Sequence, residues 1–186
     1  MRTAFKEWAI VVDALGRGEQ IIILRKGGIA EGRGGFKVEH PRFLLFSTLF
    51  HQQREAVIST AQVRYDEIVQ TLPPPDRVQI QFSAEVVEWF RLDSIESANR
   101  FRGQHIWRDE VIAERFEWGR SKDIFAIAVR VFRLASPIEL PMAPSYGGCR
   151  SWVELESDVG ATTVAPVFDS ERFALKLKRF RAALET

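Results

Sequence analysis

Residues 78–89 read Val-Gln-Ile-Gln-Phe-Ser-Ala-Glu-Val-Val-Glu-Trp, and their pattern predicts the central strand of the domain. Up to Val86, apolar and polar side chains alternate, which is the pattern of a strand with one buried and one exposed face. Beyond that point the order reverses, because Val87 and Trp89 take polar positions while Glu88 takes an apolar one. One extra residue in the strand explains such a reversal, so the sequence predicts a bulge near Val86 or Val87.

The flanking segments predict the other elements of the domain. Short apolar runs indicate buried strands, and apolar residues at helical spacing indicate helices. The predicted strands cover 20–24, 43–46 and 124–132, and the predicted helices cover 4–15, 54–71, 107–117 and 170–186. Pro137 and Pro141 are expected to end the last strand. Asp169 or Ser170 is expected to cap the C-terminal helix.

This order of elements predicts an α+β fold with helices at the ends of the sheet. The sheet is expected to be small, mixed or antiparallel, and either curled or closed into a β-barrel. The length of 186 residues favours one core. We therefore expect a single domain over residues 1–160 and an appended amphipathic helix over residues 170–186.

The composition limits the compartment and the partners of the protein. A single cysteine cannot form an internal disulfide, and the first residues lack the apolar stretch of a secretion signal, so we expect a reducing cytoplasm. The richest apolar run, Ile21 to Leu24, is too short to cross a membrane. The net charge of +1 gives no general attraction to nucleic acid, so such a partner must bind a local patch.

Several runs of sequence resemble one bacterial family, the domain of unknown function 1802. The resemblance is carried by Lys6-Glu7-Trp8-Ala9, Leu24-Arg25-Lys26-Gly27-Gly28-Ile29, Glu39-His40-Pro41-Arg42-Phe43-Leu44-Leu45-Phe46, Phe50-His51-Gln52 and Gly148-Cys149-Arg150-Ser151-Trp152-Val153-Glu154-Leu155. It spans roughly residues 5–155 and leaves the C-terminal helix outside. The family name implies no activity.

The order of elements is also similar to that of ASCH and EVE domains of the PUA-like superfamily. This similarity implies a small barrel that binds RNA or modified bases in a basic cleft. Two parts depart from the pattern, because residues 47–76 form a long insertion and the segment after Leu140 has no counterpart. A likeness of fold does not establish function.

A glycine-rich basic segment is the first candidate site. Between residues 17 and 42, cations outnumber carboxylates, and glycines let a backbone approach a phosphate closely. The residues that would bind nucleic acid are Arg25, Lys26, Gly27, Gly28 and Arg42, together with His51 and Gln52, and Arg33 and Lys37 add charge nearby. The alternative is a surface loop whose charges are only solvated, since the spacing matches no known phosphate-binding motif.

Two other groups carry candidate chemistry. Glu39 and His40, with His51, could act as acid and base, or could instead tie down a loop through backbone hydrogen bonds. No spacing indicates a metal site, and no cofactor is expected. Cys149 beside Arg150 could be a nucleophile, although an isolated cysteine is more often a buried apolar residue.

The C-terminal helix offers an interaction surface. Its apolar stripe must be covered either by its own domain or by a second copy, which would form a homodimer through Phe173, Leu177 and Phe180.

Three functions follow from these features. The leading hypothesis is a non-enzymatic module that binds RNA, DNA or a nucleotide, with Arg25, Lys26 and Arg42 on phosphate and His51 or Gln52 on a polar edge. The second is a hydrolase of a modified base or nucleotide that uses Lys26 or His51 with Glu39. The third is a protein-interaction or dimerisation domain.

Overall fold

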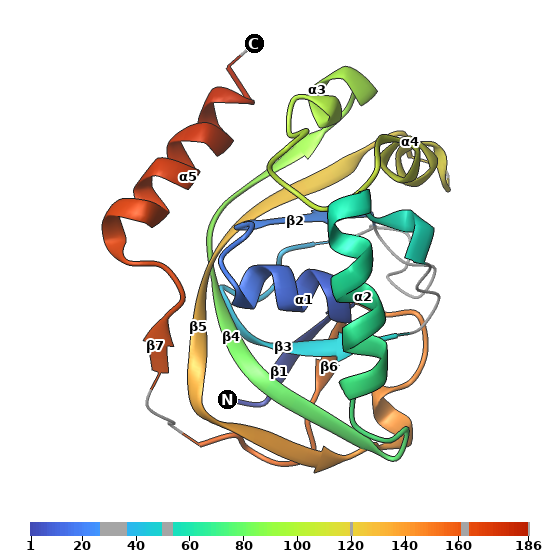
Figure 1. The fold of residues 1–186 in the computed structure, drawn as a ribbon, viewed down its shortest axis with the longest axis vertical. Helices are drawn as coiled ribbons and strands as arrows, with labels where there is room; N and C mark the ends of the chain where they lie inside the picture. Colours follow the sequence, from blue (N-terminus) through green and yellow to red (C-terminus); the bar gives the residue numbers. More distant parts are fainter. Residues whose placement is uncertain (27–36, 50–53, 120, 161–163, 186) are drawn as a thin grey trace.

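One mixed sheet curls around a short helix (Figure 1). The structure is a computed structural model, and it describes residues 1–26, 37–49, 54–119, 121–160 and 164–185. Within these residues the strand order is β2-β5-β4-β3-β1-β6, and β7 pairs with β5. The strands are β1 (Thr3–Trp8), β2 (Ile22–Arg25), β3 (Arg42–Thr48), β4 (Arg77–Leu92), β5 (Ile124–Pro141), β6 (Trp152–Glu154) and β7 (Val164–Pro166). The end strands β2 and β6 do not pair, so the sheet is curled and not closed into a barrel.

The long hairpin of β4 and β5 forms the centre of the sheet. Its antiparallel register shifts between Val86 and Glu88, which confirms the predicted bulge. The expectation that Pro137 ends β5 was wrong, because β5 continues to Pro141. A second register shift, between Ile80 and Phe82, lies opposite the stretch that holds Pro137. An irregular stretch tolerates a residue that cannot donate to the strand ladder.

The N-terminal segment was predicted to be one helix over 4–15, and only its second half is helical. Thr3–Trp8 form β1, which pairs in parallel with β3 and antiparallel with β6, and α1 covers Ala9–Gly16. Pairing with two strands from distant parts of the chain overrides the local helical spacing. The turn after α1 contains Gly18, whose φ of 72° lies in the left-handed region that favours glycine.

The other helices lie around the edges of the sheet. They are η2 (Arg54–Ala56), α2 (Ser59–Thr71), α3 (Ile95–Asn99), α4 (Asp109–Glu117), η3 (Pro144–Tyr146) and α5 (Ser170–Ala182). The predicted helices over 54–71 and 107–117 correspond to α2 and α4, each with a later start than expected. No helix in the described part of the chain is long and apolar enough to cross a membrane.

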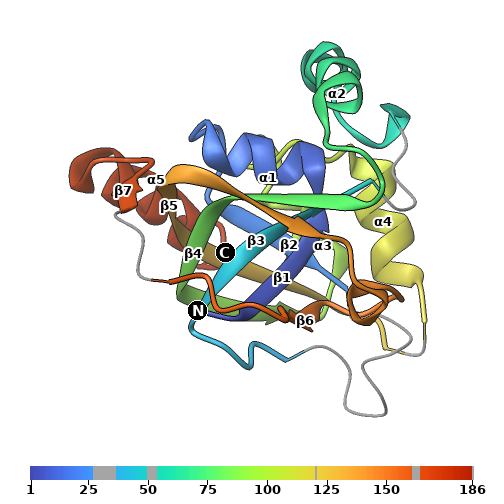
Figure 2. The ribbon, with the colours of Figure 1, turned by 90° about the horizontal axis from the view of Figure 1, so that it is seen from below.

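Helix α5 lies against the outside of the curled β4–β5 hairpin (Figures 1 and 2). Asp169 caps it as predicted, since its side chain accepts a hydrogen bond from the backbone N–H of Arg172. Phe173 and Phe180 are buried, and the ring of Phe180 lies 5.1 Å from that of Phe101. The apolar stripe that could have formed a dimer is thus largely covered by its own chain.

The sheet has two distinct faces, defined here by β3. The inner face carries Phe43 and Leu45 and packs in the same core as α1, whereas the outer face carries Leu44 and Phe46. Residues from segment 143–159 pack against the outer face, in a second core cluster. Side chains alternate between the two faces along each strand, so the register assigns every strand residue to one of them.

Candidate functional site

Two arginines and an aromatic residue form a row on the inner face at one end of the sheet. Arg25 of β2 pairs with Phe125 of β5, which pairs with Arg91 of β4. Paired residues of neighbouring strands point to the same face, and the strands lie about 4.8 Å apart, so the two arginine Cα atoms are about 10 Å apart. Trp89 lies in the next row on the same face, and its ring centroid is 5.9 Å from that of Phe125.

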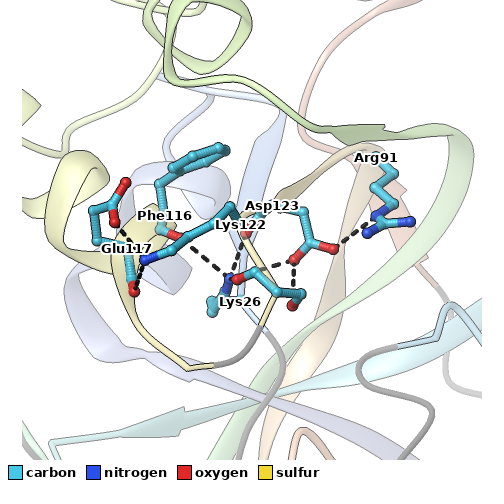
Figure 3. A network of polar contacts seen from close by, with 7 residues as sticks. Lys26, Arg91, Phe116, Glu117, Lys122 and Asp123 are labelled. Carbon is cyan, nitrogen blue, oxygen red and sulfur yellow. Dashed lines mark hydrogen bonds and ion pairs between the residues drawn. The ribbon is translucent and has the colours of Figure 1, made fainter.

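Arg91 is held in place by a buried carboxylate (Figure 3). Asp123 Oδ2 accepts a hydrogen bond of 2.7 Å from Arg91 Nε, and Asp123 Oδ1 accepts one of 3.0 Å from the Ser121 hydroxyl. Burial alone would raise the pKa of Asp123, but hydrogen bonds from Ser121, Arg91 and Lys26 outweigh it and lower the pKa. Asp123 is therefore ionised at neutral pH and fixes the exposed Arg91 guanidinium.

Lys26 supports this arrangement from below the surface. Its ammonium lies 3.3 Å from Asp123 Oδ1 and donates to the backbone oxygens of Phe116, Ser121 and Asp123 (Figure 3). The side chains of Lys26 and Asp123 are each only 9% exposed. These contacts connect the end of β2 to α4 and to the start of β5. The Lys26 ammonium is therefore occupied by groups of its own chain and is not available to a ligand.

Arg25 joins the two edges of the curled sheet. Its Nε and Nη2 donate hydrogen bonds of 2.9 and 2.6 Å to the hydroxyl of Ser151, which directly precedes β6. Its guanidinium carbon also lies 5.3 Å from the ring centroid of Phe5. Since β2 and β6 are the two ends of the strand order, this side chain bridges a gap that backbone pairing leaves open.

Beside Arg25, further rings extend the aromatic surface. Trp152 packs edge-on against Phe5 and Phe43, at 4.8 and 5.1 Å, and its indole N–H donates to the backbone oxygen of Lys37. The ring of His40 lies 5.0 Å from Trp152. We call this region the basic–aromatic end, and it comprises Arg25, His40, Trp89, Arg91, Phe125 and Trp152.

A stacked arginine lies behind the basic–aromatic end. The guanidinium carbon of Arg115 is 3.7 Å from the ring centroid of Trp107 and 5.2 Å from that of Trp8. Burial lowers the pKa of Arg115 to about 10, against the opposing charge of Glu7, so the side chain stays cationic at neutral pH. Glu7 is buried, and its carboxylate accepts a hydrogen bond from the backbone N–H of Trp8. This part of the chain therefore adds positive charge near Arg25.

The structure separates the residues that the sequence grouped into one phosphate site. Arg25 belongs to the basic–aromatic end, and Lys26 only supports it. Arg42 lies on the outer face, where its Nε and Nη2 donate to Glu85 Oε1 at 3.0 and 2.9 Å. Gly27, Gly28, Arg33, His51 and Gln52 lie outside the described residues.

The predicted acid–base groups do not meet in the described part of the chain. Lys26 bonds to oxygens of three other residues, and none of them belongs to Glu39. Glu39 is exposed, and His40 packs against Trp152. Cys149 is exposed as a free thiol, which differs from the buried alternative considered for it.

Sequence reasoning missed Trp89, Arg91 and Asp123. The sequence did contain a signal for Trp89 and Arg91. The reversed alternation after Val86 predicts that odd-numbered residues of this strand turn from the exposed face to the buried one. Asp123 gave no such signal, since its role depends on the pairing of β5 with β4.

The comparison with family models assigns the chain to a family. The model described as domain of unknown function (DUF1802) matches residues 4–179. The chain belongs to this family. The match extends into α5, so the expectation that the C-terminal helix lies outside the family was wrong. No protein with a curated description matches the chain.

Solved structures show the same fold at low sequence identity. The structure of the S128A mutant of an ASCH protein from Zymomonas mobilis aligns with a TM-score of 0.50 and 11% identity, over 96% of this chain and 94% of that one. The unmutated ASCH protein from Zymomonas mobilis aligns with a TM-score of 0.49 and 12% identity, over 87% and 95% of the two chains. The DUF1802 chain thus shares the ASCH-type, PUA-like fold.

Proposed function

We propose that this DUF1802 protein binds single-stranded nucleic acid, or a nucleotide, at the basic–aromatic end. The observation that carries the proposal is the pair of Trp89 and Arg91 on the inner face. Trp89 offers an exposed ring, and Arg91 offers a guanidinium whose orientation is fixed by Asp123. A site that binds nucleic acid without reading its sequence needs two parts. These are an aromatic ring that stacks on a base and a cation that contacts a phosphate.

The geometry favours unpaired bases over a duplex. Stacking on Trp89 requires a base whose face is open, which a base inside a double helix does not offer. Arg25 lies across Phe125 from Arg91 and supplies a second cation about 10 Å away. The resemblance to ASCH and EVE domains implies the same class of ligand, whereas the structural comparison supports the fold alone.

Charge near the site supports an anionic ligand. Arg25, Lys26, Arg91 and Arg115 are four cations, and Glu7 and Asp123 are two carboxylates, so the cations exceed the carboxylates by two. The whole chain has a net charge of only +1. A local excess of this kind is what attracts a nucleic acid to a chain with a low net charge.

The test is a binding titration with a short fluorescent single-stranded RNA, monitored by anisotropy at low salt. Trp89→Ala should weaken binding about tenfold, since one stacked base contributes about 1–3 kcal/mol. Arg91→Gln should also weaken binding about tenfold, because it removes a cation from the phosphate. The matched duplex should bind more weakly than the single strand.

Two controls match the variants in exposure. Trp118 and Trp89 are each 48% exposed, so Trp118→Ala tests for a general effect of losing a surface ring. Arg42, with its side chain 69% exposed and paired to Glu85, matches Arg91, which is 59% exposed and paired to Asp123. Binding that is absent at low salt, or that responds to Arg42→Gln and not to Arg91→Gln, would overturn the proposal.

A further inference from the structure

A cavity of about 460 Å³ lies on the outer face, away from the basic–aromatic end. Leu44, Ser83 and Phe132 form one row across β3, β4 and β5 and line it together. Val159 and Val164 line it from the segment that follows β6 and from β7. Its size falls in the range of pockets that bind small molecules.

The lining is mostly apolar, and it includes the side chain of Ser83. Ser83 is 8% exposed and lines the cavity, where its hydroxyl can donate a hydrogen bond to a ligand. A hydroxyl among apolar side chains favours a ligand that offers it a hydrogen-bonding group. Leu44, Phe132 and Leu134 supply apolar surface around it.

The rim of the cavity carries an arginine with donors to spare. Arg42 directs Nε and Nη2 to a single oxygen of Glu85, and Nη1 has no acceptor in the part of the chain that the structure describes. The N-terminal residue Met1 also lines the cavity, and its ammonium pairs with Asp158. An anionic group at this rim can therefore reach a guanidinium that still has a free face.

We infer that this cavity binds a small amphipathic acid, with an apolar acyl or aryl body and one carboxylate-like head. The body fills the space above Leu44 and Phe132, the head meets Arg42, and a polar atom near the head accepts from the Ser83 hydroxyl. The site is independent of the proposed nucleic-acid site, because Arg42 and Arg91 lie on opposite faces of the sheet. An apolar cavity with one paired arginine is poorly suited to a polyanion.

The experiment uses octanoate, octanol and octylammonium as probes that share one tail and differ in the head. Binding is followed on the full chain by ¹H–¹³C methyl spectra, which report Leu44, Leu134, Val159 and Val164 directly. Octanoate should shift these methyl signals and bind about tenfold more tightly than octanol, since a hydrogen bond to a charged group is stronger than one to a neutral group. Octylammonium should bind more weakly than octanol, because its positive charge is repelled by Arg42. Arg42→Gln should reduce octanoate binding to the level of octanol.

A blocking variant tests the position of the ligand. A Cβ at Gly160, which lines the cavity, would meet nothing within 4 Å, so the position accepts a side chain and Gly160→Phe should fill part of the cavity. It should abolish octanoate binding, and Leu175→Phe, on the exposed side of α5, should not. Octanoate affinity unchanged by Gly160→Phe, or equal affinity for octylammonium, would overturn the inference. RNA binding should be unaffected by Gly160→Phe, so this proposal and the proposed function can fail separately.

Discussion

Mild acid should destabilise this protein through His105. His105 is 6% exposed and lines a pocket between the turn after α1 and the start of α2. Its Nδ1 accepts a hydrogen bond of 3.2 Å from the backbone N–H of Trp107, so the proton of the neutral ring is on Nε2. Burial lowers the pKa of His105 to about 4, although the nearby charge of Asp109 opposes the shift.

The sign and the size of the effect follow from the two protonation states. In the unfolded chain the ring takes up a proton near pH 6.5, whereas in the folded protein it does so only near pH 4. As the pH falls below 6.5, the unfolded state binds more protons, and the free energy of unfolding decreases. The full loss is about 3.4 kcal/mol, from about 2.5 pKa units at 1.36 kcal/mol each. At pH 5.5 it is about 1.4 kcal/mol.

Urea denaturation between pH 7.5 and 5.0 measures this loss, with His105→Asn as the reference. The asparagine oxygen can accept the same N–H of Trp107 but does not titrate, and the other two histidines contribute equally to both proteins. The pKa values of Asp109 and Asp123 are lowered, so these carboxylates titrate below the window. The wild-type free energy should fall relative to that of the variant, and parallel curves would refute the reasoning.

Three other changes have expected outcomes. Lys26→Met removes the cation beside the buried Asp123 and should lower the free energy of unfolding by about 3–5 kcal/mol, measured by urea denaturation. A decrease below about 1 kcal/mol would show that the pair is not buried in solution. Gly16→Ala places a Cβ 2.1 Å from the ring of Phe82 and should lower stability by about 1–3 kcal/mol in thermal unfolding, unless that ring can move freely. Arg91→Gln should reduce the slope of log affinity for single-stranded RNA against log salt concentration by about 0.7, and an unchanged slope would place the phosphate elsewhere.

Local patterns in the sequence were sufficient to predict most strands of the central sheet. The strands at 20–24 and 43–46, the alternating strand from Val78 and the helix after Asp169 all form, because each is encoded by neighbouring residues. The predicted helix over 4–15 failed in its first half, since β1 exists through pairing with β3 and β6. Such pairing depends on residues far along the chain, and no local pattern records it.

The candidate site was harder to predict, because residues that are neighbours in the sequence, such as Arg25, Lys26 and Arg42, were expected to lie in one site. Arg25 and Arg42 flank the same glycine-rich segment, but strand alternation places them on opposite faces of the sheet. Lys26 follows Arg25 directly, and a buried carboxylate and backbone oxygens take up its charge. Arg91 and Asp123 reach Arg25 only through the register of β2, β5 and β4, which the sequence does not specify.

The bulge in β4 links the fold to the proposed function. With regular alternation, Glu88 and Phe90 would follow Val86 onto the inner face, and Trp89 and Arg91 would lie outside. The shift between Val86 and Glu88 exchanges the two pairs. Glu88 then pairs with α5 and Phe90 packs against it on the outer face. Arg91 joins the inner-face row of Phe125 and Arg25, and Trp89 lies in the next row of that face. Since one inserted residue both anchors the C-terminal helix and builds the basic–aromatic end, loss of the bulge should remove both together.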